Sequence, residues 1–139
     1  MGERPDGKKL QGCVKIHKIH TFCPGWYSGR AVHIHFTVRT KAADGQDYQF
    51  TSQFFFDNTL TDQVHAQEPY AGKGQHDTRN ADDDIYNGGG DQLLLNLEGD
   101  NANGYTSTFN VGLDLADTES GGSGLHGSTW RRSASISGN

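Results

Sequence analysis

In the predicted strand over residues 30–40, the side chains from 32 to 38 alternate between apolar and polar, and this alternation constrains the fold more than any other feature of the sequence. The apolar positions are Val32, Ile34, Phe36 and Val38, and the polar positions between them are His33, His35 and Thr37. Successive side chains of a β-strand point to opposite faces of the sheet, so a period of two predicts a strand with one face in the core. The other face carries two imidazoles.

Composition limits what can be built around this strand. The chain has 139 residues, of which 32% are hydrophobic and 19 are glycine, so we expect one domain at most, with a small core. The formal net charge is −5 and no basic stripe occurs, so nucleic-acid binding is not expected. The sequence contains no apolar run of about 18 residues, so no membrane span is expected. The first residues lack the apolar stretch of a signal peptide, so as written the chain is expected to be soluble and cytoplasmic, and export is the alternative if the N-terminus is missing.

The two ends of the chain differ from its middle. Residues 1–12 are polar and show no periodicity, so we expect an irregular N-terminus. Residues 118–139 are dominated by Ser and Gly, which predicts a disordered tail. The core is therefore expected over residues 13–117, where strand-like runs alternate with turns rich in Gly, Asn and Asp.

The segment that follows the alternating strand predicts a hairpin and then a helix. A turn at residues 43–45 leads into an aromatic-rich run over 48–56, which is typical of a buried strand paired with the first one. Thr59 is the expected N-cap of a short helix over residues 60–67, and Pro69 prevents its continuation.

The remainder of the core is expected to be loop and strand. Residues 70–91 read as a long polar loop, and the runs 93–97 and 105–115 predict two strands joined by a turn at 99–104. The expected fold class is mainly β: an antiparallel β-sandwich with one short helix and long loops.

His33 and His35 are spaced for metal binding. At positions i and i+2 of a strand they share a face, with Cα atoms roughly 6.6 Å apart, a span that one metal ion about 2.1 Å from each imidazole nitrogen can bridge. Tyr27 follows a Pro-Gly turn that can aim its phenolate toward the same face, and Arg30 supplies a permanent cation for an anionic substrate. The alternative is an outward strand face that carries two polar residues and binds no metal.

The surrounding segments resemble a known family. The string PGWYSGRAVHIHF resembles the iron-ligand segment of the intradiol ring-cleavage dioxygenases, which cleave catechol or protocatechuate with non-haem ferric iron. TSQFFFD at 51–57 is similar to a substrate-side strand of that family. The later strings LTDQVHAQEPY and DTRNADDDIYNGGGDQLLLNL are similar to its bacterial branch. The resemblance covers about residues 20–116.

The resemblance implies a site and a reaction. Tyr27, His33 and His35 would hold Fe(III), with Tyr27 leaving the iron when catecholate binds, and Arg30 and Gln53 would lie beside the substrate. The implied activity is the insertion of O2 between the two hydroxyl-bearing carbons of a catechol, which gives a muconate-type diacid in aromatic compound catabolism.

The resemblance also implies an alternative. Family members carry a second tyrosine ligand upstream, whereas Tyr27 is the first tyrosine of this chain. The expectation is thus an N-terminally truncated member, and the alternative to a dioxygenase is an inactive fragment or a non-enzymatic metal-binding or interaction β-sandwich. Missing strands would leave a sheet edge uncovered, which favours a homodimer.

Three further patterns allow other interpretations. Zinc-binding residue types occur as C-x3-H-x2-H-x2-C in Cys13, His17, His20 and Cys23. The acidic stretch 80–85 reads as a solvated loop, because Ile85 stands where a calcium-binding EF-hand loop needs glycine. Surface positions are expected for His65, His76 and His126. Trp26 is interpreted either as lining the site or as a structural aromatic beside a turn.

Overall fold

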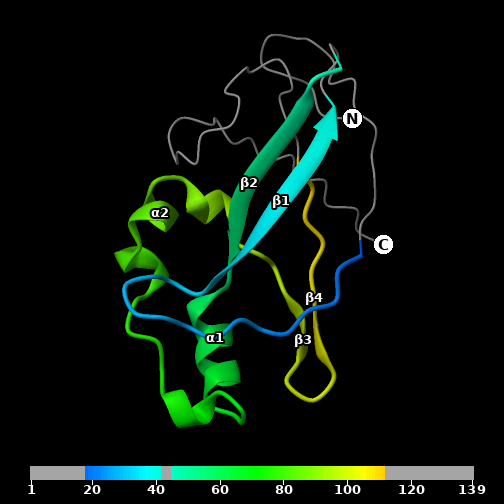
Figure 1. The fold of residues 1–139 in the computed structure, drawn as a ribbon. Helices are drawn as coiled ribbons and strands as arrows, with labels where there is room; N and C mark the ends of the chain where they lie inside the picture. The colour runs from blue at the N-terminus through cyan, green and yellow to red at the C-terminus, as the bar shows by residue number, and fades with distance from the viewer. Residues whose placement is uncertain (1–17, 42–44, 112–139) are drawn as a thin grey trace.

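The computed structural model of the chain describes residues 18–41 and 45–111, which are coloured in Figure 1. The predicted irregular N-terminus (1–12) and the predicted tail (118–139) lie outside these residues. The described part contains two antiparallel hairpins and several short helices connected by loops, so the fold is mainly strand and loop. None of the described helices has the length and apolar character needed to cross a lipid bilayer.

The long hairpin confirms the first two predicted strands. It pairs β1 (His33–Lys41) with β2 (Asp47–Phe55), and the register places His33 opposite Phe55 and His35 opposite Gln53. Beyond His33, the odd-numbered positions of β1 are exposed and the even-numbered positions up to Val38 are half-buried, as the alternation predicts. His33 itself is only 8% exposed, because it lies where the hairpin joins the rest of the fold (Figure 1).

Helix α1 (Asn58–His65) begins two residues before the predicted start. Its N-cap is Asp57 rather than Thr59, because the Asp57 carboxylate accepts hydrogen bonds from the backbone N–H groups of Thr59 at 2.9 Å and Leu60 at 3.2 Å. An aspartate in this position also interacts favourably with the helix dipole.

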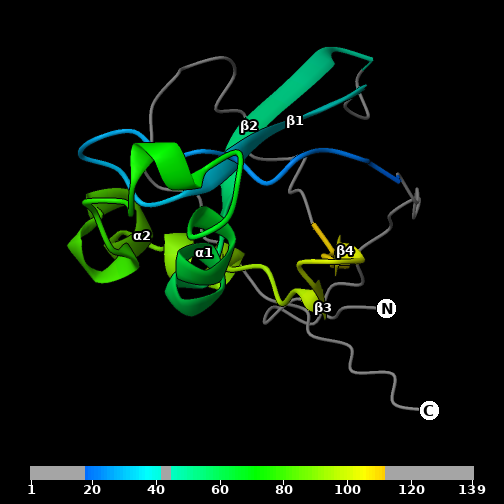
Figure 2. The ribbon, with the colours of Figure 1, turned by 90° about the horizontal axis from the view of Figure 1, so that it is seen from below.

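The prediction of a long polar loop over residues 70–91 is wrong. The segment folds into η1 (Ala71–Lys73), η2 (Asn80–Asp82), α2 (Asp84–Asn87) and η3 (Gly90–Leu93). Each of these helices is about one turn long, so none produces the repeated apolar spacing by which a helix is recognised in a sequence. Figure 2 shows α1 between α2 on one side and the short hairpin β3–β4 on the other.

The prediction of a strand over residues 93–97 is also wrong. Leu93 ends η3, and Leu94 makes a single parallel bridge with Phe55 of β2. The Leu95 N–H donates to the Phe55 carbonyl at 2.9 Å. The apolar run therefore crosses the base of the long hairpin and does not form a strand of its own.

The last hairpin is shorter than expected. β3 (Glu98–Asp100) and β4 (Gly104–Thr106) are paired antiparallel, and the Asp100 carboxylate closes their turn by accepting from the backbone N–H groups of Ala102 and Asn103, each at 2.8 Å. Of the strand predicted over 105–115, residues 107–111 are irregular and 112–115 lie outside the described residues.

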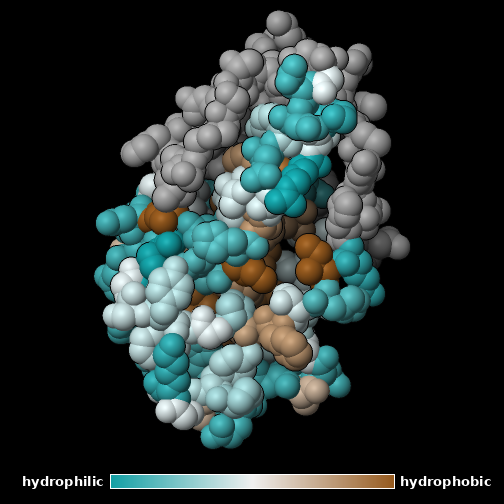
Figure 3. All heavy atoms as spheres, viewed as in Figure 1, coloured by the Kyte–Doolittle hydropathy of each residue, from teal (hydrophilic) through white to brown (hydrophobic). Residues whose placement is uncertain are grey.

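The described core is small and lies at the base of β2. Ala31, Phe55 and Leu93 form its buried centre. The half-buried apolar side chains that pack against this centre are Phe54, Ile85, Tyr86, Leu94 and Phe109. Figure 3 shows apolar side chains gathered in the middle of one face, surrounded by hydrophilic ones. This core lies directly behind His33, whose ring centroid is 6.0 Å from that of Phe55.

Candidate metal centre

The loop that carries Tyr27 passes over α1 before the chain enters β1 (Figure 1). In this Tyr27 loop, residues 23–29, the Cys23 carbonyl accepts a hydrogen bond from the Tyr70 hydroxyl at 2.6 Å. The Pro24 carbonyl lies 3.1 Å from Nε2 of His65. His65 is 1% exposed and stacks on Tyr70, with ring centroids 5.3 Å apart. The start of the loop is therefore bound to α1 and to the residues that follow it.

The other end of the Tyr27 loop is held by residues 73–77. The Trp26 indole N–H donates to the Gly74 carbonyl at 2.9 Å, and the Lys73 ammonium donates to the Trp26 carbonyl and lies over its ring. The Gly29 N–H donates to the Asp77 carboxylate at 3.3 Å. Trp26 thus has a structural contact, and the backbone on both sides of the 53% exposed Tyr27 is fixed.

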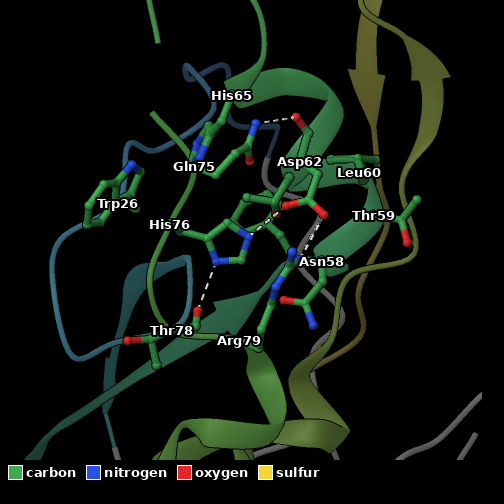
Figure 4. A network of polar contacts seen from close by, with 12 residues as sticks. Trp26, Asn58, Thr59, Leu60, Asp62, His65, Gln75, His76, Thr78 and Arg79 are labelled. Atoms are coloured by element: carbon green, nitrogen blue, oxygen red, sulfur yellow. Dashed lines mark hydrogen bonds and ion pairs between the residues drawn. The ribbon is translucent and has the colours of Figure 1, made fainter. Parts of the chain in front are cut away.

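Residues 73–77 are in turn held on α1 by a polar cluster shown in Figure 4, which we call the Asp62 clasp: Asp62, His76 and Arg79. The Asp62 carboxylate lies 3.1 Å from Nε2 of His76 and 2.8 Å from Nη1 of Arg79. Nδ1 of His76 lies 2.9 Å from the Thr78 carbonyl. The hydrogen bond from Arg79 is the main reason that the pKa of Asp62 is lowered. The clasp links α1 to the segment that supports the Tyr27 loop.

The prediction that His65 and His76 are surface residues is wrong. They are 1% and 7% exposed, and each has a ring nitrogen facing a backbone carbonyl, that of Pro24 in the Tyr27 loop for His65 and that of Thr78, two residues on, for His76. Loop carbonyls enclosed by other segments need donors, and imidazole provides one. His126 lies outside the described residues.

His33 has its two ring nitrogens directed to different partners. Nδ1 lies 2.7 Å from the Ala31 carbonyl, which only accepts, so Nδ1 carries the proton. Nε2 lies 3.3 Å from the Tyr27 hydroxyl, and the two rings meet edge to face. Burial is the main reason that the pKa of His33 is lowered, so the neutral ring is favoured. A neutral imidazole with its proton on Nδ1 has the Nε2 lone pair available for a metal.

His35 lies on the same face as His33, as the spacing predicts. Their ring centroids are 5.0 Å apart, and His35 is exposed at the position opposite Gln53. Gln53 is only 3% exposed, although its strand neighbours are less buried. The structure therefore brings Tyr27, His33 and His35 to one place at the start of β1.

Arg30 and Gln53, which were predicted beside the substrate, contact each other. The Arg30 guanidinium donates from Nη2 to the Gln53 side-chain oxygen at 3.0 Å and from Nε to the Asp83 carboxylate at 2.7 Å. Arg30 is also one of the charges that disfavour protonation of His33. A fixed cation thus lies close to the candidate ligands.

Asp83 is the site residue that sequence reasoning missed, because the acidic stretch 80–85 was interpreted as a solvated loop. Asp83 is 1% exposed and caps α2. Burial alone would raise its pKa, but hydrogen bonds from Arg30 and from the backbone of Tyr86 and Ala31 outweigh that effect, and the pKa of Asp83 is lowered. The available signal was the preference of aspartate for N-cap positions, with a second acidic residue, Asp84, in the first turn of the helix.

The donor set is suited to ferric iron. The contact between the Tyr27 hydroxyl and Nε2 of His33 marks a point that an anionic oxygen and a neutral nitrogen can both reach, and His35 lies beside it. Phenolate oxygen with two imidazoles matches iron better than magnesium or calcium. Within residues 18–41 and 45–111, no group of three or more His, Cys, Asp or Glu side chains is arranged to hold a metal.

The alternative zinc motif is only partly described. Cys13 and His17 lie outside the described residues. His20 is exposed, and Cys23 is a half-buried free thiol whose pKa burial raises. A raised thiol pKa disfavours the thiolate that zinc requires.

Comparison with known proteins found no match: no family model matches the chain, and neither the curated proteins nor the solved structures contain a significant match to it.

Proposed function

We propose that Tyr27, His33 and His35 bind ferric iron and that the chain is an intradiol dioxygenase acting on a catechol. The observation that carries the proposal is the direct contact of Tyr27 with Nε2 of His33, whose other nitrogen is bound to the Ala31 carbonyl. This arrangement prepares an oxygen and a nitrogen donor for one ion. The finer fold assignment, an antiparallel β-sandwich, belongs to the same proposal.

The protein residues have distinct parts in the proposed reaction. Ferric iron, when bound, acts as a Lewis acid and a template for the catecholate and its reaction with O2. Arg30 stabilises negative charge on the substrate, since Asp83 and Gln53 fix its guanidinium. Tyr27 is 53% exposed, so its side chain has room to move aside for the incoming catecholate. The carbon–carbon bond between the hydroxyl-bearing carbons breaks, and both atoms of O2 enter the diacid.

The experiment that tests the proposal is reconstitution of the full chain with ferric iron. A tyrosinate bound to ferric iron gives a visible charge-transfer band, and we expect about one iron per chain and a band that shifts when catechol is added without oxygen. Oxygen uptake and muconate formation should follow on admission of air. A colourless, iron-free protein would refute the proposal.

Variants assign the ligands. His35→Ala should lose iron and colour, whereas Thr37→Ala, on the same exposed face of β1, should retain both. Unchanged iron content in His35→Ala would overturn the ligand assignment. Bound iron and a catechol-dependent shift without oxygen uptake would favour the alternative, a metal-binding module without turnover.

A further inference from the structure

Asp83 connects α2 to the candidate metal centre through both of its carboxylate oxygens. Oδ2 accepts from Nε of Arg30 at 2.7 Å and from the Ala31 N–H at 2.8 Å. Oδ1 accepts from the backbone N–H groups of Ile85 at 2.9 Å and Tyr86 at 3.0 Å. One oxygen therefore fixes the carboxylate to the start of a helix, and the other holds the chain that leads into β1.

The contact with Ala31 continues to a proposed metal ligand. Ala31 is 1% exposed, and while Asp83 binds its N–H, its carbonyl lies 2.7 Å from Nδ1 of His33. The position of that carbonyl decides which nitrogen of His33 carries the proton and where Nε2 points. Oδ2 of Asp83 is thus bonded both to the guanidinium and to the backbone that orients the imidazole.

We infer that Asp83 is a positioning residue of the candidate metal centre, which holds Arg30 toward the substrate and, through the backbone of Ala31, fixes the tautomer and direction of His33. The inference rests on the proposed function. Asp83 contacts neither metal nor substrate itself, and it acts only through its hydrogen bonds to Arg30 and to the Ala31 backbone. Loss of such a partner typically lowers metal affinity or activity roughly 10- to 100-fold.

The test compares two matched substitutions. Asp83→Asn retains an oxygen that can cap α2, but it presents an amide N–H2 to two donors, Arg30 and the Ala31 N–H. Asp57→Asn makes the same change at the N-cap of α1, where the carboxylate accepts from backbone N–H groups and is exposed. The control therefore shares the capping role and lacks the arginine.

Two readouts follow the variants in the full chain. In the metal-free protein, ¹⁵N NMR of the His33 ring reports its tautomer, and the exchange rate of the Arg30 Nε–H reports its hydrogen bond. In the ferric protein, chelator competition measures iron affinity. We expect Asp83→Asn to show mixed His33 tautomers, faster Arg30 exchange and roughly 10- to 100-fold weaker iron binding, with Asp57→Asn unchanged in all three. A folded Asp83→Asn with wild-type tautomer and exchange overturns the inference.

A double variant, Arg30→Gln/Asp83→Asn, removes both charges of the ion pair, so that neither the buried Asp83 carboxylate nor the half-buried Arg30 guanidinium is left without its partner, which could unfold the protein. It is compared with the wild type, and we expect it still to mix the His33 tautomers, because the Ala31 contact is lost. Identical tautomers in the two proteins overturn the inference. A wild-type chain that binds no ferric iron refutes the proposed function, and the metal-free NMR then decides the role of Asp83 by itself.

Discussion

Gly90→Ala tests the packing that supports the candidate site from behind. A Cβ atom at residue 90 would lie 2.5 Å from Cε2 of Phe55 and 2.8 Å from the Ile85 carbonyl oxygen. Neither neighbour can move cheaply, because the Phe55 side chain is 0% exposed and the oxygen belongs to the backbone of α2. Phe55 also contacts His33, with ring centroids 6.0 Å apart, so a displaced Phe55 ring would disturb a proposed ligand.

The size of the effect follows from two opposing contributions. Forcing one extra methyl group into a packed core costs about 1–3 kcal/mol. Alanine also restricts the unfolded chain more than glycine does, which offsets roughly 0.4–1 kcal/mol of that cost. We therefore expect Gly90→Ala to lower the free energy of unfolding by roughly 1.3 kcal/mol when the middle of each range is taken, and by at most about 2.6 kcal/mol. Gly72→Ala is the control, since its Cβ would meet nothing within 4 Å, and it should leave stability unchanged or slightly raised.

The assay is urea denaturation of both variants and of the wild-type protein, followed by circular dichroism and tryptophan fluorescence. Gly90→Ala with the same midpoint as Gly72→Ala would refute the packing argument. The double variant Phe55→Leu/Gly90→Ala adds a check, because a smaller residue at position 55 makes room for the new methyl group. Its loss of stability should be smaller than the sum of the two single losses.

Three other predictions concern acid, metal and the clasp. Because the folded-state pKa of Asp83 is lowered, Asp83 stabilises the protein above its unfolded pKa of about 3.9, and this contribution is lost as the pH falls through the folded value. The urea midpoint should consequently drop in acid more in the wild type than in Asp83→Asn, and parallel curves would contradict this. Iron should dissociate on dialysis below about pH 6, because only a neutral imidazole binds the metal; constant iron content in acid would argue against histidine ligation. Asp62→Asn should speed exchange of the Trp26 indole N–H by loosening residues 73–77, and an unchanged rate would show that the clasp does not support the Tyr27 loop.

The long hairpin could be predicted because its pattern is local. Alternation along β1 and the aromatic run of β2 fix the strand type and the faces without reference to any other part of the chain. The predictions that were wrong concern segments whose structure depends on partners distant in sequence. The leucine run at 93–97 is as apolar as a strand, yet Leu94 contributes one bridge to Phe55, because η3 has already turned the chain across the hairpin base.

The candidate site also has a part that could be predicted from local sequence and a part that could not. Strand geometry alone placed His33 and His35 on one face, and their ring centroids are 5.0 Å apart in the structure. The sequence offered no means of pairing Asp83 with Arg30, which is 53 positions earlier in the chain. A contact of this range depends on the fold, which brings the N-cap of α2 to the residues just before β1.

The sequence by itself determined the alternating strand with its two imidazoles. It also placed a phenol and a guanidinium close to that strand, since periodicity and spacing are properties of a few neighbouring residues. Only the tertiary structure decided which nitrogen of His33 faces Tyr27, which contacts hold the Tyr27 loop in place and which carboxylate orients Arg30. The physical reason is burial: His65 and Asp83 became enclosed by segments distant in sequence, and each finds a partner there, in the Pro24 carbonyl and in the Arg30 guanidinium.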